Sequence, residues 1–340
     1  MKNLMNKLKK SDLADKITLI VAMILLVILF GSLNPNYMSG SNLTNVLIAC
    51  SLTGFVAIGE TNLIIAGQND LSAGSVAACA GVLAAILVRM GVPVVLAILI
   101  SVLVGCMVGA INATLVTMLN LQPFIATLAT MSVARGAAYI LCNGKAVAIS
   151  DKTFIRLGNY RIFGFLPLPV LFLLISFIVF GIMLSKTYFG RSIYVLGGNT
   201  YAARLAGLNP KAIIFKLHIM ESGLAAFAGI MLAARMNSGQ PSACEGLEFD
   251  AITAAVLGGT AFTGGVGTIF GTFLGMLVLQ GFKTGLNMVG VQTFWQEVAQ
   301  GALLVVALAF DFYRKHNRDK HALAESMAAR GITIPGKENK

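Results

Sequence analysis

Long apolar stretches constrain this chain most, because they recur along nearly all of it. A helix of about 17 to 25 apolar residues can cross a hydrocarbon core of ~30 Å. The sequence therefore predicts an all-α, polytopic membrane protein with about ten transmembrane helices. Nine such stretches lie near 17–33, 43–66, 73–91, 94–119, 124–141, 166–185, 213–236, 266–288 and 295–313. A tenth near 250–263 is shorter, which favours a half-helix or a re-entrant element.

Composition agrees with a bilayer as the solvent. Hydrophobic residues make up 57% of the chain and charged residues 11%, which leaves too little polar surface to cover a water-soluble globule. A net charge of +11 would suggest nucleic acid in a soluble protein, but most of these charges flank apolar stretches. Membrane lipid is the expected partner of the surface, and no nucleic acid is expected.

Basic residues predict the orientation. Five precede residue 17, five lie in the connection 186–216 and seven follow residue 311. Cytoplasmic loops carry such an excess, so both termini and this connection are predicted to be cytoplasmic, although basic residues in 142–165 weaken the count. The predicted parts are a cytoplasmic segment 1–16 followed by a retained first span, a transmembrane domain 17–313, and a polar cytoplasmic tail 314–340, disordered or loosely attached.

Two polar, glycine-rich interruptions, 67–74 and 258–265, break apolar stretches in the two halves of the chain. Backbone freed from helical pairing at membrane depth is tolerated only against protein or a watery cavity. Paired breaks of this kind point to a transport path between repeats. Aligning Gly67 with Gly258 gives a weak internal match.

Polar side chains at the breaks are the candidate path residues. Gln68 and Asn69 are expected to line a cavity, whereas Asp70 is expected mainly to cap the helix that follows it. His218 and Glu221, spaced i and i+3, suggest an interfacial pair near the cytoplasmic start of their span. The full path set is Glu60, Gln68, Asn69, Asp70, Ser72, Thr260 and Thr263.

The sequence contains no pattern that indicates a catalytic site or a metal-binding site. No Cys, His, Asp or Glu residues have metal-ligand spacing, and no Ser/His/Asp order suggests hydrolysis. No GxxxxGK[ST] loop occurs, so any ATP has to be bound by another subunit. The chain is expected to be no enzyme and to bind no cofactor itself.

The connection 186–216 predicts a short docking helix. Asn199 or Thr200 can cap a helix over 201–206, and Gly207 with Pro210 ends it. A solvated connector without a partner is the alternative.

Several strings resemble one family, the permease subunits of bacterial ABC importers for monosaccharides of the ribose, xylose, galactose and arabinose group. The resemblance covers nearly all of 17–313, in the order and spacing of its strings. These are Asp70 to Ser75, Phe124 to Leu128 with Arg135-Gly136, Gly190 to Tyr194, Gly197 to Asn199, Ala203 to Gly207, Phe249 to Ile252, Val256 to Thr260, Gly264 to Gly267, Gly271-Thr272, Asn287, Gly290 and Trp295-Gln296.

The resemblance implies a permease fold in the inner membrane, working by alternating access. A second copy or a close relative would complete a dimeric core, and a periplasmic binding protein would deliver the solute. ATP and magnesium would be held by an ATPase subunit docked on the 186–216 loop. The expected coupling residues are Arg191, Asn199, Arg204 and Gly207.

Departures from the family pattern lie at the first break. Glu60 stands where sugar permeases usually have an apolar residue, and Gln68-Asn69 precedes Asp70 where they have Gly-Ile. A more polar or partly cationic solute is therefore conceivable. Alternative readings are an ion-coupled secondary transporter that uses Glu60 and Asp70, or an ABC permease for nucleosides or branched-chain amino acids.

Overall fold

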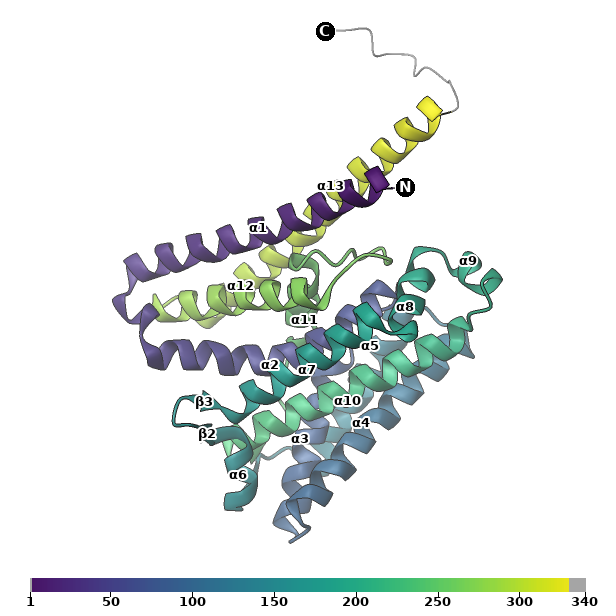
Figure 1. The fold of residues 1–340 in the computed structure, drawn as a ribbon. Coiled ribbons are helices and arrows are strands. Elements are labelled where there is room, and N and C mark those ends of the chain that lie inside the picture. Colours follow the sequence, from purple (N-terminus) through teal and green to yellow (C-terminus); the bar gives the residue numbers. More distant parts are fainter. Residues whose placement is uncertain (1, 330–340) are drawn as a thin grey trace.

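The helices of a computed structural model follow the apolar stretches closely, and residues 2–329 are described by it (Figure 1). The helices are α1 (Lys2–Leu33), α2 (Gly40–Ile65), α3 (Ala73–Arg89), α4 (Val94–Thr117), α5 (Pro123–Leu141), α6 (Lys152–Asn159), α7 (Leu168–Lys186), α8 (Tyr188–Gly198), α9 (Thr200–Leu205), α10 (Pro210–Met236), α11 (Leu247–Leu257), α12 (Ile269–Met288) and α13 (Thr293–Ala329), with a 3₁₀ turn at Pro35–Met38.

Length and hydropathy single out seven of the described helices as able to cross a membrane, α2, α4, α5, α7, α10, α12 and the first part of α13. Two further apolar helices are shorter, Ile17–Leu33 within α1 and Ala73–Arg89. The chain is thus a multi-pass membrane protein. The short stretch near 250–263 forms α11, which has 11 residues and ends at the second break, as expected of a half-helix.

Two details differ from the sequence-based picture. The fold is not purely helical, because two antiparallel pairs of two-residue strands join β1 (Val147–Ala148) to β4 (Ser238–Gly239) and β2 (Arg161–Ile162) to β3 (Leu166–Pro167). Helix α13 runs past residue 313 to Ala329, so the described part of the tail is helical; residues 330–340 lie outside the described part of the chain. The division into 1–16, 17–313 and 314–340 stays a prediction.

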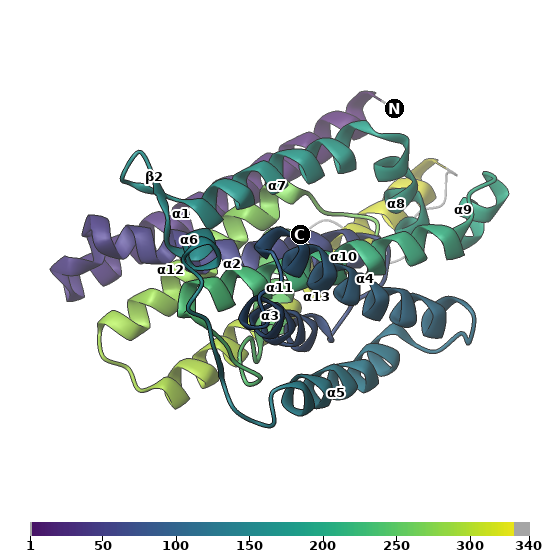
Figure 2. The same ribbon diagram turned by 90° about the horizontal axis from the view of Figure 1, so that it is seen from below.

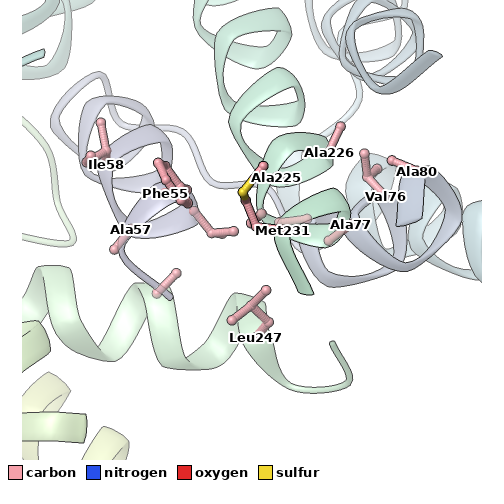
Figure 3. Close-up of a cluster of buried hydrophobic side chains, with 14 of the residues drawn as sticks. Phe55, Ala57, Ile58, Val76, Ala77, Ala80, Ala225, Ala226, Met231 and Leu247 are labelled. Carbon is pink, nitrogen blue, oxygen red and sulfur yellow. The ribbon is translucent and has the colours of Figure 1, made fainter. Parts of the chain in front are cut away.

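Helix α10 is the centre of the fold and packs against α2, α3 and α4. Small residues make this packing close: a Cβ added at Gly229 would collide with the backbone carbonyl of Ala77 on α3. Phe55 from α2, Met231 from α10 and Leu247 from α11 fill the remaining space (Figure 3). Small residues at helix contacts are the usual means of tight packing in membranes, where burial from water gives helices no reason to associate.

The two ends of the helix bundle carry different elements. The start of α1 and the helices α8 and α9 lie at one end, and α6 with the β2–β3 pair lies at the other (Figures 1 and 2). Helix α6 lies within the connection 142–165 and begins where the Asp151 carboxylate accepts the Phe154 N–H at 2.8 Å. This placement agrees with the predicted assignment of the first terminus and the 186–216 loop to the same side.

The contact at Gly229 generates a stability prediction. We expect Gly229→Ala to lower the melting temperature of the detergent-solubilised protein, because forcing a methyl group against the Ala77 carbonyl costs about 1–3 kcal/mol. Gly301→Ala on α13 is the matched control, since a Cβ there meets no atom within 4 Å. Equal melting temperatures for the two variants would refute the proposed role of the contact.

Candidate functional site

The first break begins where α2 ends in a left-handed glycine. Gly67 has a φ of +75°, and the next residue, Gln68, donates its N–H back to the Leu63 carbonyl at 2.9 Å. A glycine in this conformation ends a helix without steric strain because it has no Cβ. Residues 66–72 therefore leave the helix direction before α3 starts at Ala73.

The second break repeats this design after α11. Gly259 has a φ of +88°, and Thr260 donates to the Ala255 carbonyl at 3.0 Å, with the same sequence separation as in the first break. The geometry pairs Gly67 with Gly259, so the sequence alignment of Gly67 with Gly258 was wrong by one residue. The reason is that Ala66, and not a glycine, occupies the position equivalent to Gly258.

The two breaks meet at a contact made of glycines. Gly265 donates its N–H to the Ile65 carbonyl at 2.8 Å, which satisfies a helix-end group of α2. A Cβ added at Gly264 would lie 3.2 Å from the Gly67 nitrogen. Each break thus supplies backbone partners for the other.

The end of helix α8 completes this contact, which we call the glycine junction (Gly67, Gly197, Gly198, Gly264 and Gly265). A Cβ at Gly197 would collide with the Ile65 carbonyl, and a Cβ at Gly265 would lie 3.0 Å from the Gly198 Cα. Nearby, the Tyr194 hydroxyl donates to the Gly267 carbonyl at 2.7 Å. The loop 186–216 therefore touches both breaks directly.

A pocket of about 420 Å³ opens beside the first break. Its polar side chains are three amides, Gln68, Asn69 and Gln122, and its aromatic side chains are Phe124, Phe249 and Phe262. Leu71, Ile252, Leu304 and Leu308 provide further apolar surface, with Gly67 and Pro123, and no lining residue is charged. We call this hollow the amide pocket.

A second hollow of about 480 Å³ shares Phe249 and Leu304 with the amide pocket. It is charged, being lined by Glu245, Lys283 and Glu297. The Lys283 ammonium lies 2.6 Å from the carboxylate of Asp250, which also receives a hydrogen bond from Gln300. Phe249 and Leu304 therefore separate a neutral hollow from a charged one along α11 and α13.

The carboxylates near the first break lie inside the protein, away from this pocket. Asp70 accepts the Ser72 N–H at 2.8 Å, the Ser72 hydroxyl at 2.6 Å and the Asn112 amide at 2.9 Å. Its own N–H points to Glu60, 3.2 Å from one oxygen. Asp70 thus orders the turn before α3 and binds a distant helix, but it does not cap α3: Ser72 is the N-cap residue, and Asp70 accepts from no N–H of the first turn, so the capping prediction was wrong.

The interpretation of His218 and Glu221 as an interfacial pair was wrong. Both side chains are fully buried, because α2 and α4 cover this turn of α10. The His218 Nδ1 atom lies 3.4 Å from the Asp70 carboxylate. Their position near the predicted start of the span had suggested an interface, and the packing of α10 at the centre of the bundle overrides it.

The predicted path residues therefore divide into three groups. Glu60, Asp70, Ser72 and Thr260 are buried, Gln68 and Asn69 are half-buried in the pocket wall, and Thr263 is exposed. Sequence reasoning missed Gln122 and the three phenylalanines, because isolated residues at helix ends carry no periodic signal. Phe124 and Phe249 did lie in the strings that carry the family resemblance.

The predicted docking loop has the expected local structure. Asn199 caps α9, accepting the Ala202 N–H at 2.9 Å, and Gly207 follows the helix with a φ of +77°. Arg191, Asn199, Arg204 and Gly207 are all exposed. The helix runs over Thr200–Leu205, one residue earlier than predicted.

The Arg135 side chain makes hydrogen bonds to two backbone carbonyls. Its guanidinium donates to the carbonyls of Pro241 and Ala243, both at 2.7 Å. It thereby holds the segment between β4 and α11 in place. Among the side chains that the structure describes (residues 17–309 and 311–313), no group of His, Cys, Asp and Glu has the arrangement of a metal site.

Comparison with known proteins agrees with these features. The family described as "Branched-chain amino acid transport system / permease component" matches residues 42–308. The L-arabinose transport system permease protein AraH of Escherichia coli is 40% identical over 305 residues, which cover 88% of this chain and 92% of that protein. AraH of Azospirillum brasilense is 38% identical, covering 88% of each chain, and the ribose import permease protein RbsC of Bacillus subtilis is 37% identical, covering 86% and 91%. No solved structure matches this chain.

Proposed function

This chain belongs to the family of permease components of branched-chain amino acid transport systems, and we propose that it is the membrane path of an ABC importer for a neutral monosaccharide. Its similar relatives include permeases named for L-arabinose and for ribose. The observation that carries the proposal is the lining of the amide pocket. Transport is by alternating access, in the inner membrane of a bacterium.

The amide pocket suits a polyhydroxylated, uncharged solute. Amide groups both donate and accept hydrogen bonds, so Gln68, Asn69 and Gln122 can pair with hydroxyl groups of either role. The exposed faces of the phenylalanines offer apolar surface to the C–H faces of a sugar ring. The volume of about 420 Å³ falls within the ~300–1,000 Å³ of small-molecule sites.

The uncharged lining argues against a cationic solute and against ion coupling through the pocket. Glu60 contributed to both readings in the sequence, and Asp70 to the ion-coupled one, but neither carboxylate lines the amide pocket. Whether Glu60, Asp70, Ser72, Thr260 and Thr263 line the path in another conformation stays a prediction. Gln68 and Asn69 have the most direct structural support.

A second copy of the chain, or a close relative, would close the pocket. Half-exposed amides at membrane depth are costly against lipid, so Gln68 and Asn69 need protein or a watery cavity in front of them. The apolar residues around the opening, Phe124, Phe249 and Phe262, are each more than two-fifths exposed. Such a rim fits a dimer that encloses the path between two permeases.

Energy would enter through the cytoplasmic loop. A separate subunit would bind and hydrolyse ATP with magnesium, docking on the exposed surface of α8 and α9 at Arg191 and Arg204. The permease itself would bind no cofactor and catalyse no reaction. A movement of α8 would reach both breaks through the glycine junction, and a periplasmic binding protein would deliver the sugar at the opposite end.

Replacing an amide of the pocket tests the proposed path. We expect Gln68→Leu or Asn69→Leu to slow sugar uptake about two- to tenfold, since each change removes hydrogen bonds worth about 0.5–1.5 kcal/mol. The apparent affinity should change less, because the binding protein selects the solute. Gln292→Leu is the control, as this exposed amide lies outside both hollows. Changed affinity at an unchanged maximal rate would contradict the path.

Two adjacent glycines test the route of coupling. We expect Gly197→Ala to lower ATP-driven uptake about tenfold. Overpacking that raises the activation free energy of transport by ~1.4 kcal/mol produces a change of this size. Gly198→Ala should leave uptake unchanged, because a Cβ there meets no atom within 4 Å. Both variants are measured in vesicles with the ATPase and the binding protein, after their insertion has been checked. Equal uptake by the two would exclude the junction as the route.

A further inference from the structure

A cluster of buried ionisable groups lies in the core of the permease, separate from the amide pocket. Glu60 comes from α2, Asp70 from the first break, and His218 and Glu221 from α10. At most 1% of each residue is exposed. Three acids and one histidine at membrane depth are expensive unless each charge has a partner.

Asp70 has the partners of an ionised carboxylate. Its oxygens accept from the N–H and hydroxyl of Ser72 and from the Asn112 amide, and His218 approaches at 3.4 Å. All the fixed partners are donors, so they stabilise a negative charge.

Glu221, in contrast to Asp70, has few hydrogen-bond partners for its carboxyl group. One of its oxygens has no hydrogen-bond partner, and the other has only the Ser222 hydroxyl at 3.4 Å. Within the described residues, no ion pair joins Glu221 or Glu60 to a lysine or arginine. A buried carboxyl group with one long hydrogen bond and no cationic partner is costly to ionise, so Glu221 holds a proton.

A proton fits this site better than a metal ion. A Cβ at Gly59 would lie 2.8 Å from the Glu221 Cα, and one at Gly105 would lie 2.9 Å from the Ser222 carbonyl. Helices α2 and α4 therefore press on the Glu221 turn from two sides and leave little room for a hydrated ion. The described residues also contain no group with metal-site geometry.

Further ionisable groups near the cluster are few. Glu248 on α11 is buried, and one of its carboxylate oxygens also lacks a partner. Arg135 on α5 is held by the carbonyls of Pro241 and Ala243. Cys106 on α4 packs against Gly223.

We propose that Glu221 binds a proton, and that this proton keeps α10 packed against α2 and the first break. Movement of α10 away from α2 during transport would expose the carboxyl group to water and release the proton. Closure would take it up again, so ATP-driven uptake depends on pH. This second part rests on the proposed transport function, whereas the proton site itself does not.

Infrared spectroscopy of the isolated permease in detergent tests the site. We expect a band of a protonated carboxylic acid at neutral pH that Glu221→Gln removes and Glu245→Gln, on an exposed residue, retains. Glutamine has the shape of protonated glutamate, so Glu221→Gln should keep its folded yield and melting temperature. Asp70→Asn should lower the melting temperature, because an amide N–H would face donors. A band unaffected by Glu221→Gln, or loss of folding in that variant, would overturn the proposal.

Uptake in vesicles with the ATPase and binding protein tests the consequence. Between about pH 5 and pH 9, a range that includes the pH at which documented buried glutamates titrate, wild-type uptake should vary and that of Glu221→Gln should lose this variation. Identical pH profiles would overturn the link to transport. Uptake that requires sodium would overturn the choice of a proton. A confirmed infrared band with no ATP-driven uptake at any pH would leave the site standing and reject the proposed function instead.

Discussion

The structure depends on how the backbone freed at its two breaks finds hydrogen-bond partners. Groups left unpaired at the end of a transmembrane helix cannot turn to lipid, so they must pair within the protein. The Ile65 carbonyl at the end of α2 accepts from Gly265 in the other break, more than half the chain away in sequence. This bond requires backbones to approach without side chains between them. Gly197, Gly264 and Gly265 meet that requirement together.

The need for close backbone contact also links the loop 186–216 to the amide pocket. Helix α8, which lies within the loop 186–216, ends against the breaks, and the first break also borders the amide pocket. The proposed coupling contact and the proposed path are therefore neighbours, although the residues concerned come from widely separated parts of the sequence.

Polar residues at membrane depth serve two purposes in this protein. Gln68 and Asn69 face a hollow, where amides can pair with a solute or with water. A second set of polar residues is buried where α2, α10 and the first break pack together: Glu60, Asp70, His218 and Glu221. The sequence-based prediction placed Glu60 and Gln68 on one transport path. The left-handed turn at Gly67 separates them, sending the amide side chains outward while Glu60 stays within the bundle.

The sequence by itself determined the helices, the breaks and the capped docking helix, because apolar length, glycine conformation and Asn capping act over a few residues. It also identified the family through the order of short strings, and relatives of 37 to 40% identity agree with that. Only the tertiary structure decided which polar groups meet. Three features join distant segments of the chain. They are the burial of His218 and Glu221, the contact of Gly197 with Ile65, and the position of Gln122 and three phenylalanines around one pocket. Such contacts depend on how α10 packs at the centre of the bundle, and no local pattern in the sequence encodes that packing.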